Sequence, residues 1–370
     1  MSGSRNGSPN PGPQSLQSLS FLAVHSPGNT VLHQFTLDYS DTDHSYCKFS
    51  QAYTDRILLL MYEAPVNALN YEGYSSLHLA VLKNNFLMVK NLLSCLKSRI
   101  NVNIKGKLSK TAFLLASENG YDKVVKELLD ASEILINEKD DYNYTPLHSA
   151  SVYGHDKVVE ELLKAPGILT DEKDCLEHIP LFVASKNGHE EVVKKLLKAP
   201  GILINEKDEK GHAALHIASR CGHEKAVKEL LKTTGILINE KDMIGYTPLH
   251  IARDKVVEYL RKAQGILINE KDEEGHTALH IASRYRQEKA VKELLKAAGI
   301  LINEKDFYYE HTPLHIASEN GRDKVVEELL KAPRILINVK DLLYLVKKNV
   351  QLGIVYPVRV IDTSKSLRTL

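Results

Sequence analysis

Residues 198–208 read Lys-Ala-Pro-Gly-Ile-Leu-Ile-Asn-Glu-Lys-Asp, and close copies of this stretch recur along the chain. The copies occupy residues 164–174, 232–242, 262–272, 296–306 and 331–341. A repeat of this length indicates a series of similar supersecondary units that pack mainly on their neighbours. We therefore expect one elongated array, although 370 residues would suffice for two ordinary domains.

Residues 307–340 show how one unit is built. Thr312 suits a helix N-cap, and Pro313 suits the first helical turn, where its missing N–H costs nothing. A short apolar helix follows and is expected to end before Gly321. Residues 323–331 then space their valines and leucines along one face of a second helix. Each unit is thus expected to contain two short helices.

This pattern resembles the ankyrin repeat, a β-turn finger followed by two antiparallel helices. The signature Thr-Pro-Leu-His is complete at residues 145–148, 247–250 and 312–315. Altered forms stand at residues 75–78, 111–114, 179–182, 213–216 and 277–280. The resemblance covers residues 28–341 and implies a mainly α ankyrin-repeat solenoid of about eight or nine repeats.

The chain divides into four expected parts. Residues 1–27 are rich in Ser, Pro and Gly, which predicts a disordered leader. Residues 28–70 are interpreted as a degenerate first unit with an insertion, and residues 71–341 as the regular repeats. Residues 342–370 are expected to form a helical cap and a basic tail, since the terminal units of repeat arrays need covering.

Two units depart from the pattern. In the short repeat, residues 243–272, Arg253 directly follows Ala252, and four residues equivalent to 318–321 are missing. Four residues are about one helical turn, so the first helix must be shortened or displaced. We expect a kink or weak point between Thr247 and Ala263. The second departure is the finger at residues 307–311, which is aromatic and one residue longer.

Charge and targeting signals exclude several classes of partner. The 48 basic and 47 acidic residues nearly cancel, so nonspecific nucleic-acid binding is not expected. The basic tail, 342–370, leaves an acidic or nucleic-acid partner as an alternative.

No stretch has the length of a transmembrane span and no signal peptide is visible, so we expect a cytoplasmic protein. The four cysteines lack paired spacing and are expected to be free thiols: Cys47, Cys95, Cys175 and Cys221.

Catalytic and metal-binding constellations are not apparent. Six of the 16 histidines recur at one repeat position, so they lie one repeat apart and cannot share one metal ion. The ankyrin resemblance implies that each bonds near the Thr of its own signature. No phosphate-binding, nucleophile-elbow or zinc-protease motif is present. We therefore expect no enzyme, cofactor, metal site or small-molecule substrate, although an active segment within residues 1–60 or 342–370 stays open as an alternative.

The residues that differ between repeats at fixed positions point to a protein interface. In the ankyrin fold these positions, in the fingers and at the ends of the first helices, line the concave surface. Tyr, Phe, Met and Arg are enriched in interfaces. The candidate partner-binding residues are Tyr142, Tyr144, Tyr153, Met243, Ile244, Tyr246, Arg284, Tyr285, Arg286, Phe307, Tyr308 and Tyr309. Some of these tyrosines could instead pack on neighbouring fingers.

The expected function is that of a scaffold or adaptor that binds another protein of unknown identity. An alternative role follows from the nearly identical repeats and the abundance of Ile, Asn and Lys. Ankyrin proteins of intracellular bacteria resemble this chain, and many act as effectors that bind host proteins in the host cytoplasm.

Overall fold

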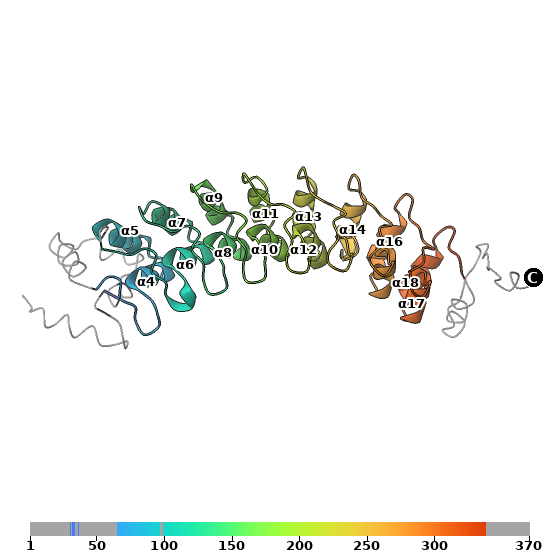
Figure 1. Ribbon diagram of the computed structural model, residues 1–370, viewed down its shortest axis with the longest axis horizontal. Helices are drawn as coiled ribbons and strands as arrows, with labels where there is room; N and C mark the ends of the chain where they lie inside the picture. The colour runs from blue at the N-terminus through green and yellow to red at the C-terminus, as the bar shows by residue number, and fades with distance from the viewer. Residues whose placement is uncertain (1–29, 31, 34–35, 37–64, 97–98, 338–370) are drawn as a thin grey trace, which may run out of the picture. The chain divides into compact units, whose positions relative to one another are not determined.

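A computed structural model of the chain describes residues 30, 32–33, 36, 65–96 and 99–337. This part contains fifteen α-helices, α4 to α18, one 3-10 helix and no β-strand (Figure 1). The expectation of a mainly α fold is confirmed, whereas the count of eight or nine repeats stays a prediction. The leader 1–27, most of residues 28–70 and the segment 342–370 lie outside the described residues.

The chain divides into two compact units. Unit 1 runs to Ala150 and includes Glu160–Ile168, while unit 2 comprises Ser151–Val159 and the residues from Leu169 onward. Helices α8 (Pro146–Tyr153) and α9 (Asp156–Lys164) contribute residues to both units. Each unit is built from pairs of short helices.

In unit 1, two complete helix pairs pack side by side. The first helices of the pairs, α4 (Ser76–Leu82) and α6 (Ala112–Glu118), contact each other. The second helices, α5 (Phe86–Cys95) and α7 (Asp122–Leu129), do the same. The short 3-10 helix, Lys107–Ser109, precedes α6. Fully buried side chains such as Phe113 form the core between these layers.

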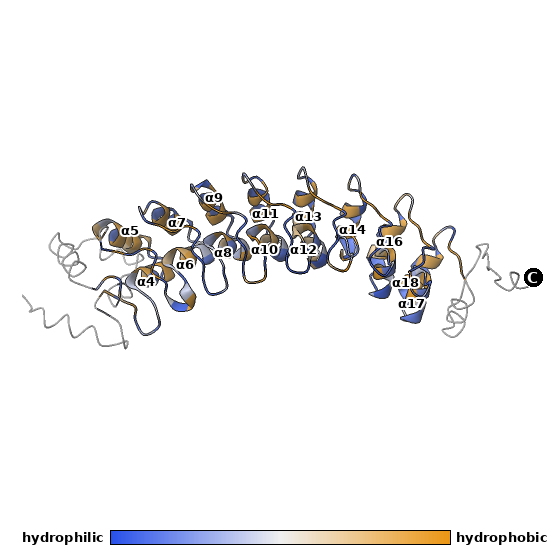
Figure 2. Ribbon diagram, viewed as in Figure 1, coloured by the Kyte–Doolittle hydropathy of each residue, from blue (hydrophilic) through white to orange (hydrophobic). Residues whose placement is uncertain are grey.

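Unit 2 repeats this arrangement. Its first helices are α10 (Pro180–Asn187), α12 (Ala214–Cys221), α15 (Ala278–Arg284) and α17 (Pro313–Glu319). Its second helices are α11 (Glu190–Leu196), α13 (Glu224–Leu231), α14 (Asp254–Arg261), α16 (Glu288–Leu295) and α18 (Asp323–Leu330). Along the chain, each second helix contacts the next second helix. The second helices, such as α11 and α13, have a hydrophobic side and a hydrophilic side, as Figure 2 shows.

Local sequence explains the helix boundaries. The Thr312 side chain accepts a hydrogen bond from the His315 N–H, and Pro313 occupies the first turn of α17. Gly188 ends α10 with a φ of 74°, a left-handed conformation that costs Gly little. On the second helices, a Val-Val-x-x-Leu pattern is buried, as Val192, Val193 and Leu196 are in α11. The expected second helix at residues 323–331 is confirmed, except that it ends at Leu330.

The short repeat lacks a first helix altogether. Residues 248–251 form a turn, and the only helix of this repeat is α14. The Arg253 N–H donates to the Ser219 carbonyl oxygen on α12 at 3.1 Å, which anchors the shortened connection to the preceding repeat. Asp254 begins α14 with a φ of 34°, an unfavourable value for a residue other than Gly. The missing turn thus removes one helix from the inner layer and leaves local backbone strain.

Candidate interaction surface

Six fingers are shaped by an Asp side chain at the start of the turn, and Asn70 takes this role in the finger of residues 70–74. In residues 242–246, Asp242 Oδ1 accepts the N–H groups of Ile244 at 3.0 Å and Tyr246 at 2.8 Å. Gly245 supplies the positive φ of 81° that closes the turn. This geometry pushes Met243 and Ile244 outward, where 67% and 54% of their surface is exposed. The finger therefore presents two apolar side chains on a rigid turn.

The longer finger, residues 306–311, presents more aromatic surface. Asp306 Oδ1 accepts hydrogen bonds from the N–H groups of Tyr309 and His311, which stand three and five residues after it. In a regular finger the two N–H groups stand two and four residues after the Asp. The inserted residue leaves Phe307, Tyr308 and Tyr309 between 60% and 74% exposed. Exposed aromatic groups of this density are typical of binding surfaces.

Phe307 also contacts the preceding finger. Its N–H donates to the Glu274 carbonyl oxygen at 3.0 Å, and the Lys271 ammonium lies 4.9 Å from the centre of its ring. A Cβ atom on Gly275 would lie 2.7 Å from Phe307 Cγ, so this glycine leaves room for the ring. The two fingers thus hold Phe307 in one orientation while most of its surface stays open.

Two candidate tyrosines have a structural role as well. Tyr144 stacks on His148 in unit 1, and Tyr246 stacks on His250 in unit 2, each with ring centres 5.7 Å apart. Burial raises the pKa of Tyr246, and the charge of Asp272 adds to this effect. Both rings are only partly accessible, whereas Tyr142 and Tyr153 are exposed. Tyr144 and Tyr246 thus pack on the signature histidines of their own repeats, and the alternative that tyrosines pack on neighbouring fingers stays a prediction.

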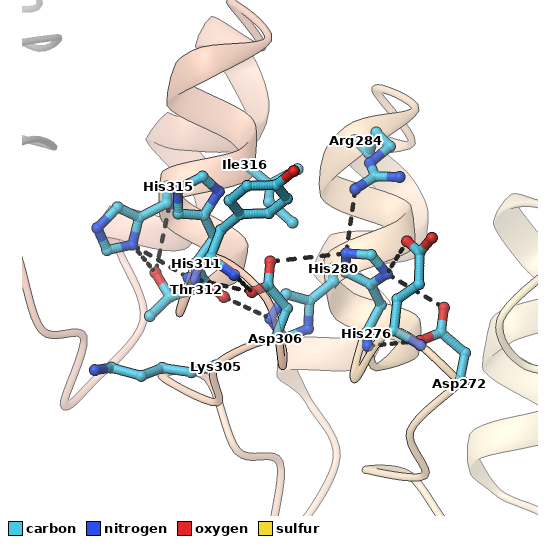
Figure 3. Close-up of polar contacts among 12 residues, drawn as sticks. Asp272, His276, His280, Arg284, Lys305, Asp306, His311, Thr312, His315 and Ile316 are labelled. Carbon is cyan, nitrogen blue, oxygen red and sulfur yellow. Dashed lines mark hydrogen bonds and ion pairs between the residues drawn. The ribbon is translucent and has the colours of Figure 1, made fainter.

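The three residues at the end of α15 have different surroundings. The Arg284 guanidinium donates to His276 Nε2, with 3.1 Å between the two nitrogens (Figure 3). Tyr285 is exposed. Arg286 has a φ of 59°. The equivalent residue in an earlier repeat is Gly188, whose φ is 74°. Of these three residues, Tyr285 presents the largest free apolar surface to a partner.

The signature histidines hold successive repeats together. In the short repeat, Thr247 Oγ1 lies 2.8 Å from His250 Nδ1, as the family resemblance implies. The other ring nitrogen, Nε2, lies 3.1 Å from the His276 carbonyl oxygen in the next repeat and must donate to it. Burial lowers the pKa of His78 and His250, and it lowers that of His216 and His280 to about 4. These four rings are therefore neutral structural groups near pH 7.

Potential metal ligands and long apolar helices are the last features of the described part of the chain. Within it, no group of three or more His, Cys, Asp or Glu side chains could hold a metal ion. None of its helices is both long and apolar enough to cross a membrane. Cys95, Cys175 and Cys221 are free thiols, and Cys47 lies outside the described residues.

A second exposed apolar feature was not expected from the sequence. The middle residue of each Ile-Leu-Ile linker points outward, and between 36% and 53% of its surface is exposed. These residues are Leu135, Leu169, Leu203, Leu237, Leu267, Leu301 and Leu336. The linkers are nearly uniform in sequence, which favours a scaffold role for them. Alternation along an extended segment was the signal that could have predicted one outward leucine in each linker.

A groove of about 870 Å³ adjoins this row of leucines at the short repeat. Leu231, Ile236, Leu237, Tyr259 and Ala263 contribute its apolar lining, and three lysines lie along it. The groove lies between α13 and α14 and the linkers that follow them.

Comparison with known families gives one match. A family model described as ankyrin repeats (3 copies) matches residues 77–174, 181–272, 236–306 and 253–341, which together cover more than half of the chain. A comparison with curated proteins gives no match.

Proposed function

Because this chain belongs to the ankyrin-repeat family, we propose that it is a non-enzymatic scaffold or adaptor that binds another protein through its fingers. Ankyrin repeats generally mediate protein–protein interaction. The proposed contact in unit 2, which we call the finger surface, consists of Met243, Ile244, Tyr285, Phe307, Tyr308 and Tyr309. Tyr142 in unit 1 and Tyr153 in unit 2 are proposed as further contacts.

The exposed aromatic finger is the observation that supports this proposal best. Phe307, Tyr308 and Tyr309 are exposed to water in the free chain. A partner that buries these rings gains a large favourable contribution to the binding free energy. The fingers are held by Asp242 and Asp306, so little conformational entropy is lost when a partner docks. Tyr246, Arg284 and Arg286 are proposed to support this surface.

The row of linker leucines offers a matched control for the test. Two variants of the full chain are compared in affinity capture from cell lysates. One changes Met243, Tyr285, Tyr308 and Tyr309 to Ala, and the other changes Leu203, Leu237, Leu267 and Leu301 to Ala. A partner that the unaltered chain and the leucine variant retain and the folded finger variant loses supports the proposal. Loss only with the leucine variant would move the site to the linkers.

The effector alternative uses the same surface and differs in where the partner comes from. Capture from host-cell lysate, but not from lysate of the organism that encodes the chain, would favour it.

A further inference from the structure

The second helices of unit 2 are nearly uniform in sequence, and the groove between α13 and α14 lies where they differ. Residues 224–231 of α13 and residues 288–295 of α16 have the same sequence, Glu-Lys-Ala-Val-Lys-Glu-Leu-Leu. The next second helix after α13 is α14, and the next after α16 is α18. Glu328 of α18 stands where α14 has Tyr259. Two identical helices therefore face different side chains.

This difference changes the partner of one lysine. Lys228 of α13 and Lys292 of α16 stand at the same position of the shared sequence. Lys292 Nζ lies 3.4 Å from Glu328 Oε1, which forms an ion pair between two helices. Lys228 Nζ instead lies 4.3 Å from the centre of the Tyr259 ring. Among the residues that the structure describes, Lys228 forms no ion pair, so its charge is open to an acidic group from a partner.

The other charged side chains around the groove are already paired within the chain. Four ion pairs, with nitrogen–oxygen distances between 2.5 and 3.6 Å, join Lys232 to Glu229, Lys262 to Glu258, Lys207 to Glu240 and Lys255 to Glu224. A partner that binds Lys228 does not have to break any of these pairs. Lys228 is therefore the cation through which the groove can recognise an acidic group.

Apolar side chains line much of the groove, whose volume is about 870 Å³. Leu231 and Tyr259 come from the two helices, and Ile236 and Leu237 come from the linker that follows α13. Leu237 is 50% exposed, so its side chain is accessible from the solvent. Grooves of this volume and lining are typical of ligand sites.

A second groove, beside α14, α16 and α18, differs in both size and charge. Its volume is about 490 Å³, and its lining includes Lys292, which is paired with Glu328. Three further carboxylates line it, those of Asp254, Glu258 and Glu293. Of these two grooves, the one between α13 and α14 combines an unpaired lysine with an apolar lining.

We propose that the groove between α13 and α14 binds a peptide segment of a partner protein in which one acidic side chain is flanked by large apolar side chains. The acidic group bonds to the Lys228 ammonium. The apolar side chains pack on Leu231, Leu237 and Tyr259. This site shares no residue with the finger surface and does not depend on the proposed function.

A peptide fits these features better than a nucleic acid or a small anion does. A nucleic-acid backbone binds through several cations, each of which neutralises a phosphate, and this groove offers one unpaired lysine. A small anion would leave Leu231, Leu237 and Tyr259 exposed, whereas a peptide with apolar side chains buries them and gains from their removal from water. Peptides that place an apolar face in a groove are a common mode of recognition.

Fluorescence polarisation with the full chain tests the charge requirement. The probe is a pool of fluorescein-labelled nonapeptides in which one Glu is flanked by Leu and Phe at varied spacing. A matched pool carries Gln in place of Glu. The Glu pool should bind, and the Gln pool should bind about tenfold more weakly, because it loses the charged bond to Lys228. Absence of binding by the Glu pool, or equal binding by the two pools, would overturn the proposal.

A variant that restores the residue of the other repeats tests the position of the site. Tyr259→Glu introduces the residue that α18 has as Glu328, so the chain should fold, and it supplies Lys228 with an internal partner. Its affinity for the Glu pool should fall by about tenfold. The control Lys292→Gln removes the equivalent lysine of α16 and should bind the pool as the unaltered chain does.

Circular dichroism establishes that both variants are folded before their affinities are compared. Unchanged affinity in Tyr259→Glu, or an equal loss in Lys292→Gln, contradicts the assignment to this groove. The finger surface is intact in both variants, so either result leaves the proposed function to its own test.

Discussion

Asn205 and Leu237 join the linkers of two successive repeats: the Leu237 N–H donates to Asn205 Oδ1 at 3.0 Å. The Asn205 side chain in turn donates from Nδ2 to the Gly235 carbonyl oxygen at 2.8 Å. Asn103, Asn239, Asn269 and Asn303 make the same pair of bonds in their own linkers. An amide both donates and accepts, which is what this position requires.

The first prediction exchanges Asn and Asp in this row. Asn205→Asp removes the donor to Gly235 and should lower the free energy of unfolding by about 1 kcal/mol. Asp171 stands at the equivalent position of its own repeat, and Asp171→Asn should raise the free energy of unfolding by a similar amount. Urea unfolding of both variants measures the two changes, and a loss of stability in Asp171→Asn would contradict the role given to this position.

Arg286 is expected to store backbone strain. Its φ of 59° costs an L-residue about 1–2 kcal/mol, which Gly does not incur. Arg286→Gly should therefore stabilise the chain by about 1 kcal/mol, whereas Arg286→Ala keeps the strain and removes only the side chain. If denaturant unfolding gives both variants the same stability, the strain is absent or relieved by the surroundings.

The short repeat is expected to be the least stable part of unit 2. It lacks a first helix, and Asp254 begins α14 with a strained φ. Hydrogen exchange should show less protection in α14 than in α13 or α16. Deletion of residues 243–272 should still permit folding, because the neighbouring repeats can stack directly. Greater protection in α14 than in its neighbours would be incompatible with a weak point here.

Two serines at one repeat position should respond differently to Ala. Ser219 Oγ is buried and has no hydrogen-bond partner, whereas Ser283 Oγ donates to the Leu279 carbonyl oxygen at 2.7 Å. Ser219→Ala should be neutral or stabilising, and Ser283→Ala should destabilise by about 1 kcal/mol. Chemical denaturation of the two single variants, under identical conditions, gives the comparison; equal losses would contradict it.

Acid should destabilise the chain through the signature histidines. Burial lowers the pKa of His280 to about 4, so the unfolded chain binds this proton at a higher pH than the folded chain. The contribution of His280 to stability is therefore full above about pH 6.5 and is lost as the pH falls toward 4. His280→Gln should be less stable than the unaltered chain at pH 7, with a smaller further loss between pH 6.5 and 4. An unchanged pH slope in melting curves would argue against this assignment.

The repeat architecture could be predicted because its determinants are local. Thr312 and Pro313 start a helix, and two adjacent apolar residues followed by Leu, such as Val325, Val326 and Leu329, bury one face of each second helix. The four-residue gap after Ala252 predicted a shortened first helix. The outcome is more extreme, since five remaining residues cannot complete a capped helical turn and form a turn instead.

Contacts between repeats could not be predicted from sequence spacing alone. The sequence determined which residues vary, and hence the candidate surface. Only the tertiary structure decided that His250 bonds to the His276 carbonyl oxygen, that Phe307 bonds to the Glu274 carbonyl oxygen, and that each linker leucine is exposed. Helix caps and apolar faces are properties of residues close together in sequence, whereas a contact between repeats joins residues such as Asn205 and Leu237, 32 positions apart, and depends on how one repeat packs against the next.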